Sequence, residues 1–349
     1  ITNIKFIKSL KPLLKNIPKS HYLFEVGNNI KLSKKISNMN LNVANNFYGF
    51  HLKKQLLASI YLIDHLELLN IVDYSFFVIK KYNPKSIILI EGVAPKDILI
   101  SEVAKKCEVK SYCIQHGYPS LVDTCFRNMD FTLYLAWGRN SVEILKPYNP
   151  LQNFKITGHL ATMNYETNNK KISTINRICF FLQGPCALMD DRELEIFYEF
   201  ILFCLEEYPN LNFTIREHPS HKINKFLLKK LCKYPNAKIS NYEKVSIREE
   251  LNSIDLSVSV FSSVIMESIA LDVIPLICSF GSLPKYNPGI ADKGAAIEVF
   301  NLEEAKKEFK KLLENKKYLS SFIKNIKIIK RNYFKECDTL KIIKDTIFQ

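Results

Sequence analysis

The sequence lacks the patterns that mark several common classes of protein. Its nine cysteines include no Cys-x-x-Cys pair, and Cys113, Cys179 and Cys278 lie inside apolar runs. We therefore expect reduced core cysteines, not a disulfide framework or a zinc site. No apolar run reaches the ~18 to 20 residues of a membrane-spanning helix, and no signal-peptide pattern opens the chain. These absences predict a cytoplasmic protein.

Short nucleotide-binding and catalytic motifs are missing as well. The sequence contains no Walker A motif, no Gly-x-Gly-x-x-Gly and no Gly-x-Ser-x-Gly, which removes the commonest NTPase, dinucleotide-binding and hydrolase sites. No Asp-x-Asp follows an apolar strand, and Asp190-Asp191 precedes an expected helix, where capping accounts for it. The sequence thus predicts an activity that needs no metal ion or other cofactor.

Length and composition predict a globular protein of two domains. Of the 349 residues, 47% are hydrophobic and 24% are charged, which is ordinary for a soluble globular chain. The length suits two cores better than one. Residues 164–173 are polar and unpatterned, so we expect an N-terminal domain over 1–168 and a C-terminal domain over 169–349. The C-terminal helices belong to the second domain or pack back on the first.

An excess of basic residues gives the chain a net charge of +14. The electrostatic field of such a charge concentrates anionic partners near the protein. Ten Lys or Arg lie in residues 305–331, interleaved with apolar residues at helical spacing, so we expect a helix with one packed face and one basic edge. A solvated helix face is the simpler interpretation. Peripheral contact with the anionic inner membrane is the alternative.

Apolar strand-like runs alternate with helical patterns from residue 85 onward. A continuous apolar run is typical of a parallel strand that is buried on both faces. The expected strands are 86–90, 109–115, 131–137, 177–182, 212–216, 254–260 and 273–278, with a short strand and a turn over 154–159. The expected helices are 53–72, 95–106, 191–207 and 263–271. This alternation predicts an α/β fold with two doubly wound, Rossmann-like domains.

The segment Arg216-Glu217-His218-Pro219 comes where one apolar strand ends. In open α/β sheets, ligands bind outside the carboxyl ends of the strands. Pro219 fixes the turn, so His218 is expected to point outward and donate a hydrogen bond to a phosphate or leaving oxygen. A histidine tied to a neighbouring carbonyl is the simpler alternative for an isolated motif. Arg216, His218 and Pro219 are thus candidates for donor binding.

Two serines and a glutamate form a second donor-binding candidate. Ser262 and Ser263 stand between an expected strand and helix, where hydroxyls and helix N–H groups can bind an anion. A helix N-cap explains one serine equally well. Glu267, one turn later, can accept hydrogen bonds from ribose hydroxyls, although a surface carboxylate would look the same. Gln183 and Gly184 follow the first strand of this half, and the glycine allows close approach of the backbone to a ligand.

Candidate catalytic groups of the first half follow two neighbouring strands. Glu91 and His116 come at the ends of consecutive expected strands, so their side chains should lie within roughly 10 Å of one another. Either can accept the proton of an attacking hydroxyl. A helix-capping carboxylate and a turn histidine are the structural alternatives. Gly92, Gln115 and Gly117 complete the expected acceptor side.

The order of these motifs resembles bacterial glycosyltransferases of the GT-B fold that build capsules and lipopolysaccharides. The resemblance rests on Gln115-His116-Gly117, residues 154–158, His218-Pro219, and Ser262-Ser263 with Glu267. It is nearest to CMP-sugar-using Kdo transferases and polysialyltransferase-like enzymes. It implies two Rossmann-like domains facing a central cleft, with His218, Ser262 and Ser263 on the donor phosphate. Glu91-Gly92 resembles the end of an acidic-acidic-Gly motif that supplies the base, with Ile90 replacing the first acidic residue.

The resemblance implies metal-independent transfer of an acidic sugar, Kdo or sialic-acid-like, from a CMP donor to a glycan or glycolipid acceptor. In a retaining enzyme, Glu91 or another carboxylate would instead be the nucleophile. The same framework is similar to CDP-glycerol glycerophosphotransferases and UDP-sugar 2-epimerases. A CDP-polyol phosphotransferase and a UDP-sugar-using transferase or epimerase are therefore alternatives. A non-catalytic nucleic-acid-binding protein is more distant, because the basic residues lack interleaved exposed aromatics or a known docking motif.

Overall fold

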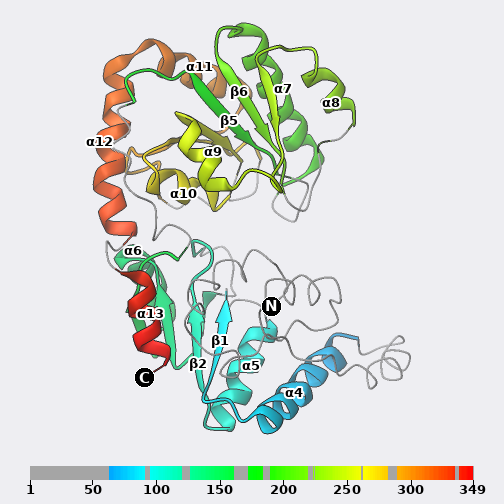
Figure 1. The fold of residues 1–349 in the computed structure, drawn as a ribbon, viewed down its shortest axis with the longest axis vertical. Helices are drawn as coiled ribbons and strands as arrows, with labels where there is room; N and C mark the ends of the chain where they lie inside the picture. The colour runs from blue at the N-terminus through cyan, green and yellow to red at the C-terminus, as the bar shows by residue number, and fades with distance from the viewer. Residues whose placement is uncertain are drawn as a thin grey trace. The chain divides into compact units, whose positions relative to one another are not determined.

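A computed structural model describes residues 63–90, 95–119, 126–160, 172–183, 189–218, 223, 225–260, 262–281, 289–334 and 338–348 (Figure 1). The chain divides into two compact units. The described residues of the N-terminal unit fall within 1–117, 123–163 and 335–349, and those of the C-terminal unit fall within 118–122 and 164–334. The expected domain boundary at 168/169 and linker residues 164–171 lie outside the described residues.

The N-terminal unit contains a parallel sheet of four described strands in the order β1-β2-β3-β4. These are β1 (Ser86–Ile90), β2 (Lys110–Ile114), β3 (Leu133–Ala136) and β4 (Phe154–Ile156). The described helices are α4 (Ile63–Tyr82), α5 (Pro95–Lys106), α6 (Arg139–Leu145), the short 3₁₀ helix η3 (Lys146–Tyr148) and α13 (Thr339–Ile347). Helices α4 and α5 pack against each other, and the buried ring of Tyr134 contacts Phe131 and Phe154.

The C-terminal unit is built on a six-stranded parallel sheet in the order β10-β9-β8-β5-β6-β7. The strands are β5 (Arg177–Phe181), β6 (Asn212–Arg216), β7 (Ala237–Ser240), β8 (Leu256–Ser259), β9 (Ile274–Cys278) and β10 (Ile297–Val299). The helices are α7 (Asp191–Glu207), α8 (Lys225–Leu231), α9 (Ile247–Ser253), α10 (Val264–Ala270), α11 (Leu302–Glu314) and α12 (Lys316–Tyr333). The first strand therefore lies in the middle of the sheet, as in a doubly wound fold.

Helices cover both faces of β5, which explains its uninterrupted apolar sequence. Cys179 and Phe181 pack with residues of α9 and α10 on one face. Phe180, on the other face, contacts Phe197 and Phe200 of α7. The ring of Phe200 in turn meets Phe309 of α11. A strand with no solvated face needs apolar residues at every position, not at alternate ones.

The structure confirms the predicted fold class, with two parallel-sheet, Rossmann-like α/β domains. It also confirms that Cys113, Cys179 and Cys278 are buried in the core. Burial raises the pKa of the Cys179 and Cys278 thiols well above the usual value, so both stay protonated and pack as apolar side chains. Among the described residues, no helix has both the length and the apolarity needed to cross a bilayer.

Two of the predicted helices differ from those observed. The single helix expected over 305–331 is wrong: α11 ends at Glu314 and α12 begins at Lys316. Asn315 causes the break, because its side chain accepts a hydrogen bond from the Tyr318 N–H at 3.0 Å and caps the second helix. The helix expected over 53–72 continues to Tyr82 as α4, and its residues 53–62 lie outside the described residues. Leu69 of this helix is exposed.

Removing the Phe180 side chain should destabilise the C-terminal unit strongly. Phe180 is fully buried at the meeting point of three other phenylalanine rings. We expect Phe180→Ala to lower the free energy of unfolding by about 3–5 kcal/mol, as cavity-forming aromatic substitutions do. Urea unfolding followed by circular dichroism measures the loss. Phe300→Ala, at a position 59% exposed, is the matched control and should cost less than about 1 kcal/mol. Equal losses in the two variants would contradict this account of the core.

Candidate functional site

The described donor-binding candidates gather at the carboxyl edge of the C-terminal sheet. Strand β5 pairs with β6 on one side and β8 on the other. The chain runs outward from β5 through β6 to β7, then returns to the other side of β5 for β8, β9 and β10. Ligands of open α/β sheets bind where the strand order reverses in this way. Gln183 follows β5, and Ser262 and Ser263 follow β8, so the fold brings these three residues to the reversal point.

Helix capping does not explain Ser263, one of the two serines at this point. Ser263 is the N-cap residue of α10, yet its side chain makes no capping hydrogen bond with the described residues. The hydroxyl of Ser262 accepts a long hydrogen bond of 3.3 Å from the Val264 N–H. Both side chains are partly exposed. The Ser263 hydroxyl thus lies at the sheet edge without the structural task that usually explains a serine at this position.

His218 lies two residues beyond the end of β6, the strand next to β5. Its side chain is partly exposed. The carboxylate of Glu217 accepts a hydrogen bond of 3.0 Å from the backbone N–H of Ile223. This bond links the residue before His218 to Ile223, five residues after His218. The structure therefore places His218 at the same sheet edge as the serines, one strand beyond β5.

Arg216 has structural partners within the C-terminal unit. Its guanidinium is buried and pairs with Glu250, with 3.1 Å between Nη1 and Oε2. It also donates to the carbonyl of Val245 at 2.7 Å and to the Ser240 hydroxyl at 3.2 Å, and Ser240 itself donates to Glu250. The network ties the end of β6 to β7 and α9. This geometry favours a structural task for Arg216 over direct contact with a donor.

Glu193 and Gly281 form a contact at the same edge that sequence reasoning missed. Glu193 belongs to the first turn of α7, which follows β5, and Gly281 lies three residues beyond β9. The buried carboxylate of Glu193 occupies the space where a Cβ of residue 281 would lie. A side chain at residue 281 would therefore displace the Glu193 carboxylate. The only sequence signal was a glycine shortly after an apolar strand.

Glu267 also lies at this edge, within α10. Its side chain is buried, and its backbone N–H donates to the Ser263 carbonyl at 3.2 Å, so it is one helical turn beyond the serines. Gln183 is partly exposed. Glu91, Gly92, Gly184 and Pro219, which complete the predicted set, lie outside the described residues.

In the N-terminal unit, Gln115 holds the end of β2 to the end of β3. The side chain of Gln115 is buried and accepts a hydrogen bond of 2.8 Å from the Trp137 N–H. Its amide nitrogen donates to the Gly117 carbonyl at 2.9 Å and to the Ser141 hydroxyl at 3.1 Å. The Trp137 indole donates back to the Gln115 carbonyl at 2.9 Å. Gln115 therefore positions the turn that carries His116.

A second histidine at this sheet edge was not singled out from the sequence. His159 lies three residues beyond β4, is 8% exposed, and packs on Trp137 with ring centroids 4.1 Å apart. His116, beyond β2, is partly exposed, as is Gly117. The signal for His159 was present as a Gly-His pair at a strand end, and Gly158 has a positive φ of 89°.

Within the described residues, no group of three or more His, Cys, Asp and Glu side chains lies together in a way that could hold a metal ion.

No model of a known protein family matches the sequence, and no curated protein matches it.

Solved structures share this fold over almost the whole chain. UDP-GlcNAc 2-epimerase from Neisseria meningitidis, bound to UDP-GlcNAc, aligns over 99% of this chain and 98% of its own with a TM-score of 0.68 and 14% identity. MnaA from Staphylococcus aureus, in a structure with UDP, aligns over 97% and 92% with a TM-score of 0.64 and 13% identity. The calicheamicin glycosyltransferase CalG4 aligns over 98% and 94% with a TM-score of 0.63 and 10% identity.

The chain has the GT-B fold. That part of the sequence-based resemblance is confirmed, because the neighbours are glycosyltransferases and nucleotide-sugar epimerases of this fold. At 10–14% identity, the similarity establishes the fold alone.

The contact between Glu193 and Gly281 should appear as coupling between two substitutions. Gly281→Ala moves the carboxylate of Glu193, the end of a flexible side chain, out of its buried position, so we expect a loss of about 0.5–1 kcal/mol in the free energy of unfolding. In the double variant with Glu193→Ala, the two losses should fall short of additivity by at least about 0.5 kcal/mol. Gly117→Ala is the control, because a Cβ there meets nothing within 4 Å. Strict additivity would show that the contact does not exist in solution.

Proposed function

We propose that the protein is a glycosyltransferase whose nucleotide-sugar donor binds at the carboxyl edge of the C-terminal sheet. The supporting observation is the placement of Ser262, Ser263 and Gln183 at the strand-order reversal, with His218 one strand away. Hydroxyl and imidazole groups are hydrogen-bond donors suited to a phosphate. The Ser263 hydroxyl caps no helix N–H among the described residues, so it is available for that purpose.

In the proposed reaction, the bond between the anomeric carbon and the donor phosphate oxygen breaks. His218, Ser262 and Ser263 stabilise the negative charge that develops on the departing phosphate. The acceptor hydroxyl oxygen forms the new bond to the anomeric carbon, and its proton passes to Glu91 or His116. Glu267 accepts hydrogen bonds from the ribose. Gln183 and Gly184 contact the donor next to the serines, and Pro219 shapes the turn after His218.

Other residues are proposed to position these groups. Arg216, held by Glu250 and Val245, fixes the end of β6, from which the chain continues to His218. Gln115, bound to Trp137 and Ser141, fixes the turn of His116 and Gly117. Gly92 lies next to the proposed base Glu91 and completes the acceptor side. The acceptor is a glycan or glycolipid of a surface polysaccharide.

For the donor, a UDP-linked sugar now ranks ahead of a CMP-linked acidic sugar. Two of the solved neighbours contain UDP or UDP-GlcNAc. The proposal of a CMP donor, in contrast, rests on the motif resemblance alone. A second candidate function follows from the same observation: the N. meningitidis 2-epimerase matches over 99% of this chain. An epimerase would change its nucleotide sugar without any acceptor, which separates the two functions.

A nucleotide panel tests the proposal. A ligand that binds only the folded protein raises the melting temperature, so we expect one of UDP, CMP and CDP to raise it more than the others at equal concentration. The matching nucleotide sugar should then lose its sugar to an acceptor glycan, detected as released nucleotide. His218→Ala should abolish both the shift and the release. Full activity in His218→Ala, or no shift with any nucleotide, contradicts the proposal. Conversion of the sugar without acceptor identifies an epimerase.

Two serine substitutions separate a ligand-binding role from a capping role. Ser263→Ala removes a hydroxyl without a capping bond, so we expect less than about 0.5 kcal/mol loss of stability but roughly tenfold weaker nucleotide binding. Ser246, the N-cap of α9, accepts a hydrogen bond of 3.1 Å from the Glu249 N–H in a capping box. Ser246→Ala should cost about 1 kcal/mol and leave nucleotide affinity unchanged. Thermal melting measures the stability of each variant, and nucleotide titration measures its affinity. Loss of stability with unchanged affinity in Ser263→Ala, and loss of affinity in Ser246→Ala, would refute the assignment of Ser263.

A further inference from the structure

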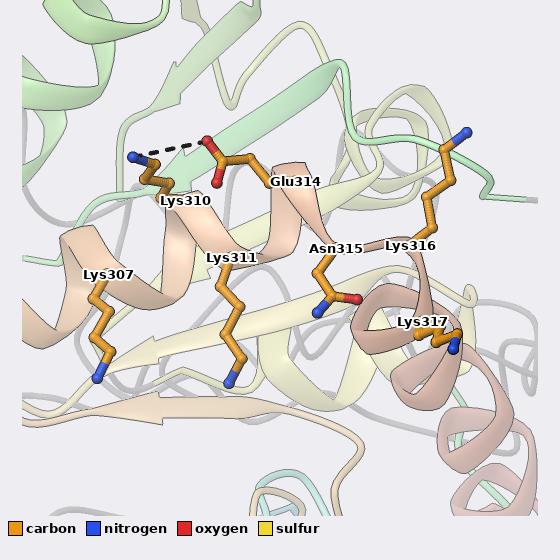
Figure 2. Close-up of a pocket in the computed structure, with 7 residues that line it drawn as sticks. All are labelled: Lys307, Lys310, Lys311, Glu314, Asn315, Lys316 and Lys317. Carbon is orange, nitrogen blue, oxygen red and sulfur yellow. Dashed lines mark ion pairs between the residues drawn. The ribbon is translucent and has the colours of Figure 1, made fainter.

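The corner between α11 and α12 carries a concentrated positive charge. An open hollow of about 590 Å³ is lined there by five lysines together with Glu314 and Asn315 (Figure 2). Lys307 and Lys311 point the same way from α11, while Lys310 and Glu314 lie on another side of the helix. The lining lysines are Lys307, Lys310, Lys311, Lys316 and Lys317.

The charge continues along α12, which contains six basic residues and no acidic residue. One of the six, Lys330, pairs with Asp272 at 3.2 Å and is mostly buried. The other five are exposed. Because an α-helix rises 1.5 Å per residue, the 18 residues of α12 extend the charged strip over roughly 27 Å. The resulting basic surface comprises Lys307, Lys310, Lys311, Lys316, Lys317, Lys324, Lys327 and Arg331.

Little of this charge is neutralised within the C-terminal unit. Lys311 lies 3.5 Å from the largely buried Glu308. Lys310 lies 3.9 Å from Glu314 in an exposed pair, and exposed pairs are weak. The other six members of the basic surface form no ion pair with the described residues. The opposite face of α12 is buried through Leu319, Phe322, Ile326, Ile329 and Tyr333, so packing fixes which side of the helix faces outward.

The corner of the basic surface lies at the amino edge of the sheet, away from the proposed donor site. A second hollow joins the end of α11, at Lys310 and Glu314, to the end of α7, at Glu207 and Tyr208. Strand β6 begins at Asn212, just after α7 ends, so both helix ends lie by the edge where strands start. The donor candidates lie where strands end. The corner lysines are therefore not part of the donor site.

The chemistry of the basic surface favours a diffuse anionic partner. Seven of its eight members are lysines, which act as flexible point charges, whereas specific carboxylate or phosphate recognition relies on the bidentate fork of arginine. The aromatic ring within it, that of Tyr318, is covered by the Lys311 ammonium 3.9 Å from the ring centroid, and its hydroxyl donates to Glu308. It offers no platform for stacking a nucleic-acid base. Ile328, 52% exposed between Lys324, Lys327 and Arg331, adds an apolar contact.

We propose that this basic surface docks the protein on an anionic phospholipid bilayer. Clusters of four to eight Lys or Arg on a helix are sufficient for such binding, at about 1 kcal/mol per residue near the membrane surface. The helix lies on the bilayer and does not enter it, because its apolar face is occupied by the protein core. The docking does not depend on the proposed glycosyl transfer.

Vesicle sedimentation of the full chain tests the proposal. We expect binding to vesicles with about 30% phosphatidylglycerol, no binding to phosphatidylcholine alone, and loss of binding as salt rises from about 0.1 to 0.5 M. Lys316→Glu, Lys317→Glu and Lys324→Glu combined should lower the partition coefficient by about 100-fold, since three cations are lost.

The matched control is the combination of Lys229→Glu, Lys233→Glu and Lys238→Glu, which changes the net charge equally at exposed positions on α8, β7 and the turn between them. It should bind anionic vesicles as the unmodified protein does, and circular dichroism should show both triple variants folded. Equal losses in the two triple variants, undiminished binding of the first, or binding to neutral vesicles would overturn the proposal. Tighter binding to single-stranded RNA or an acidic polysaccharide at the same salt would also overturn it. None of these outcomes bears on the nucleotide panel.

Discussion

The alignment of β5 with β8 is the constraint on which the candidate site depends, and an ion pair at the start of the two strands supports their pairing. Asp255, just before β8, accepts hydrogen bonds from the backbone N–H and the guanidinium of Arg177, the first residue of β5, and its own N–H donates to the Arg177 carbonyl at 2.8 Å. Burial alone would raise the pKa of Asp255, but the hydrogen bonds from Arg177 and Asn176 outweigh it and hold that pKa below its usual value. The carboxylate stays charged, the strands stay in register, and the residues that follow them, Gln183 and Ser262, come to the same edge.

The sequence could predict those parts of the fold that are recorded in local patterns. Strands β5 and β9 are buried on both faces and have continuous apolar runs that are easy to recognise. Strand β8 is equally buried, but serines alternate with its apolar residues. The short edge strands β7 and β10 mix polar and apolar residues and were missed, because an edge strand needs no such run. Arg216 and His218 share one strand end, and only the position of Glu250, distant in sequence, shows that the arginine has a structural task. The contact of Glu193 with Gly281 joins the first turn of α7 to the segment after β9 and leaves no trace in local spacing.

A parallel sheet with helices on both faces separates tasks between its two edges. At the carboxyl edge, loops carry polar groups whose positions are fixed by strand register, which suits a ligand that must be held in one orientation. At the amino edge, helix ends present lysines whose long side chains are free to reorganise, which suits a partner without defined geometry. The proposed donor site and the proposed membrane-docking corner therefore use different kinds of residue: Ser and His at the carboxyl edge, and Lys by the amino edge.

The single tryptophan of the chain occupies a position with a practical meaning. Trp137 is buried at the end of β3, with its indole N–H on the Gln115 carbonyl and its ring against His159. Its intrinsic fluorescence therefore originates wholly within the N-terminal unit, beside the turn that carries His116. Emission intensity becomes a local optical reporter of events near that turn, unmixed with signals from indoles elsewhere in the protein.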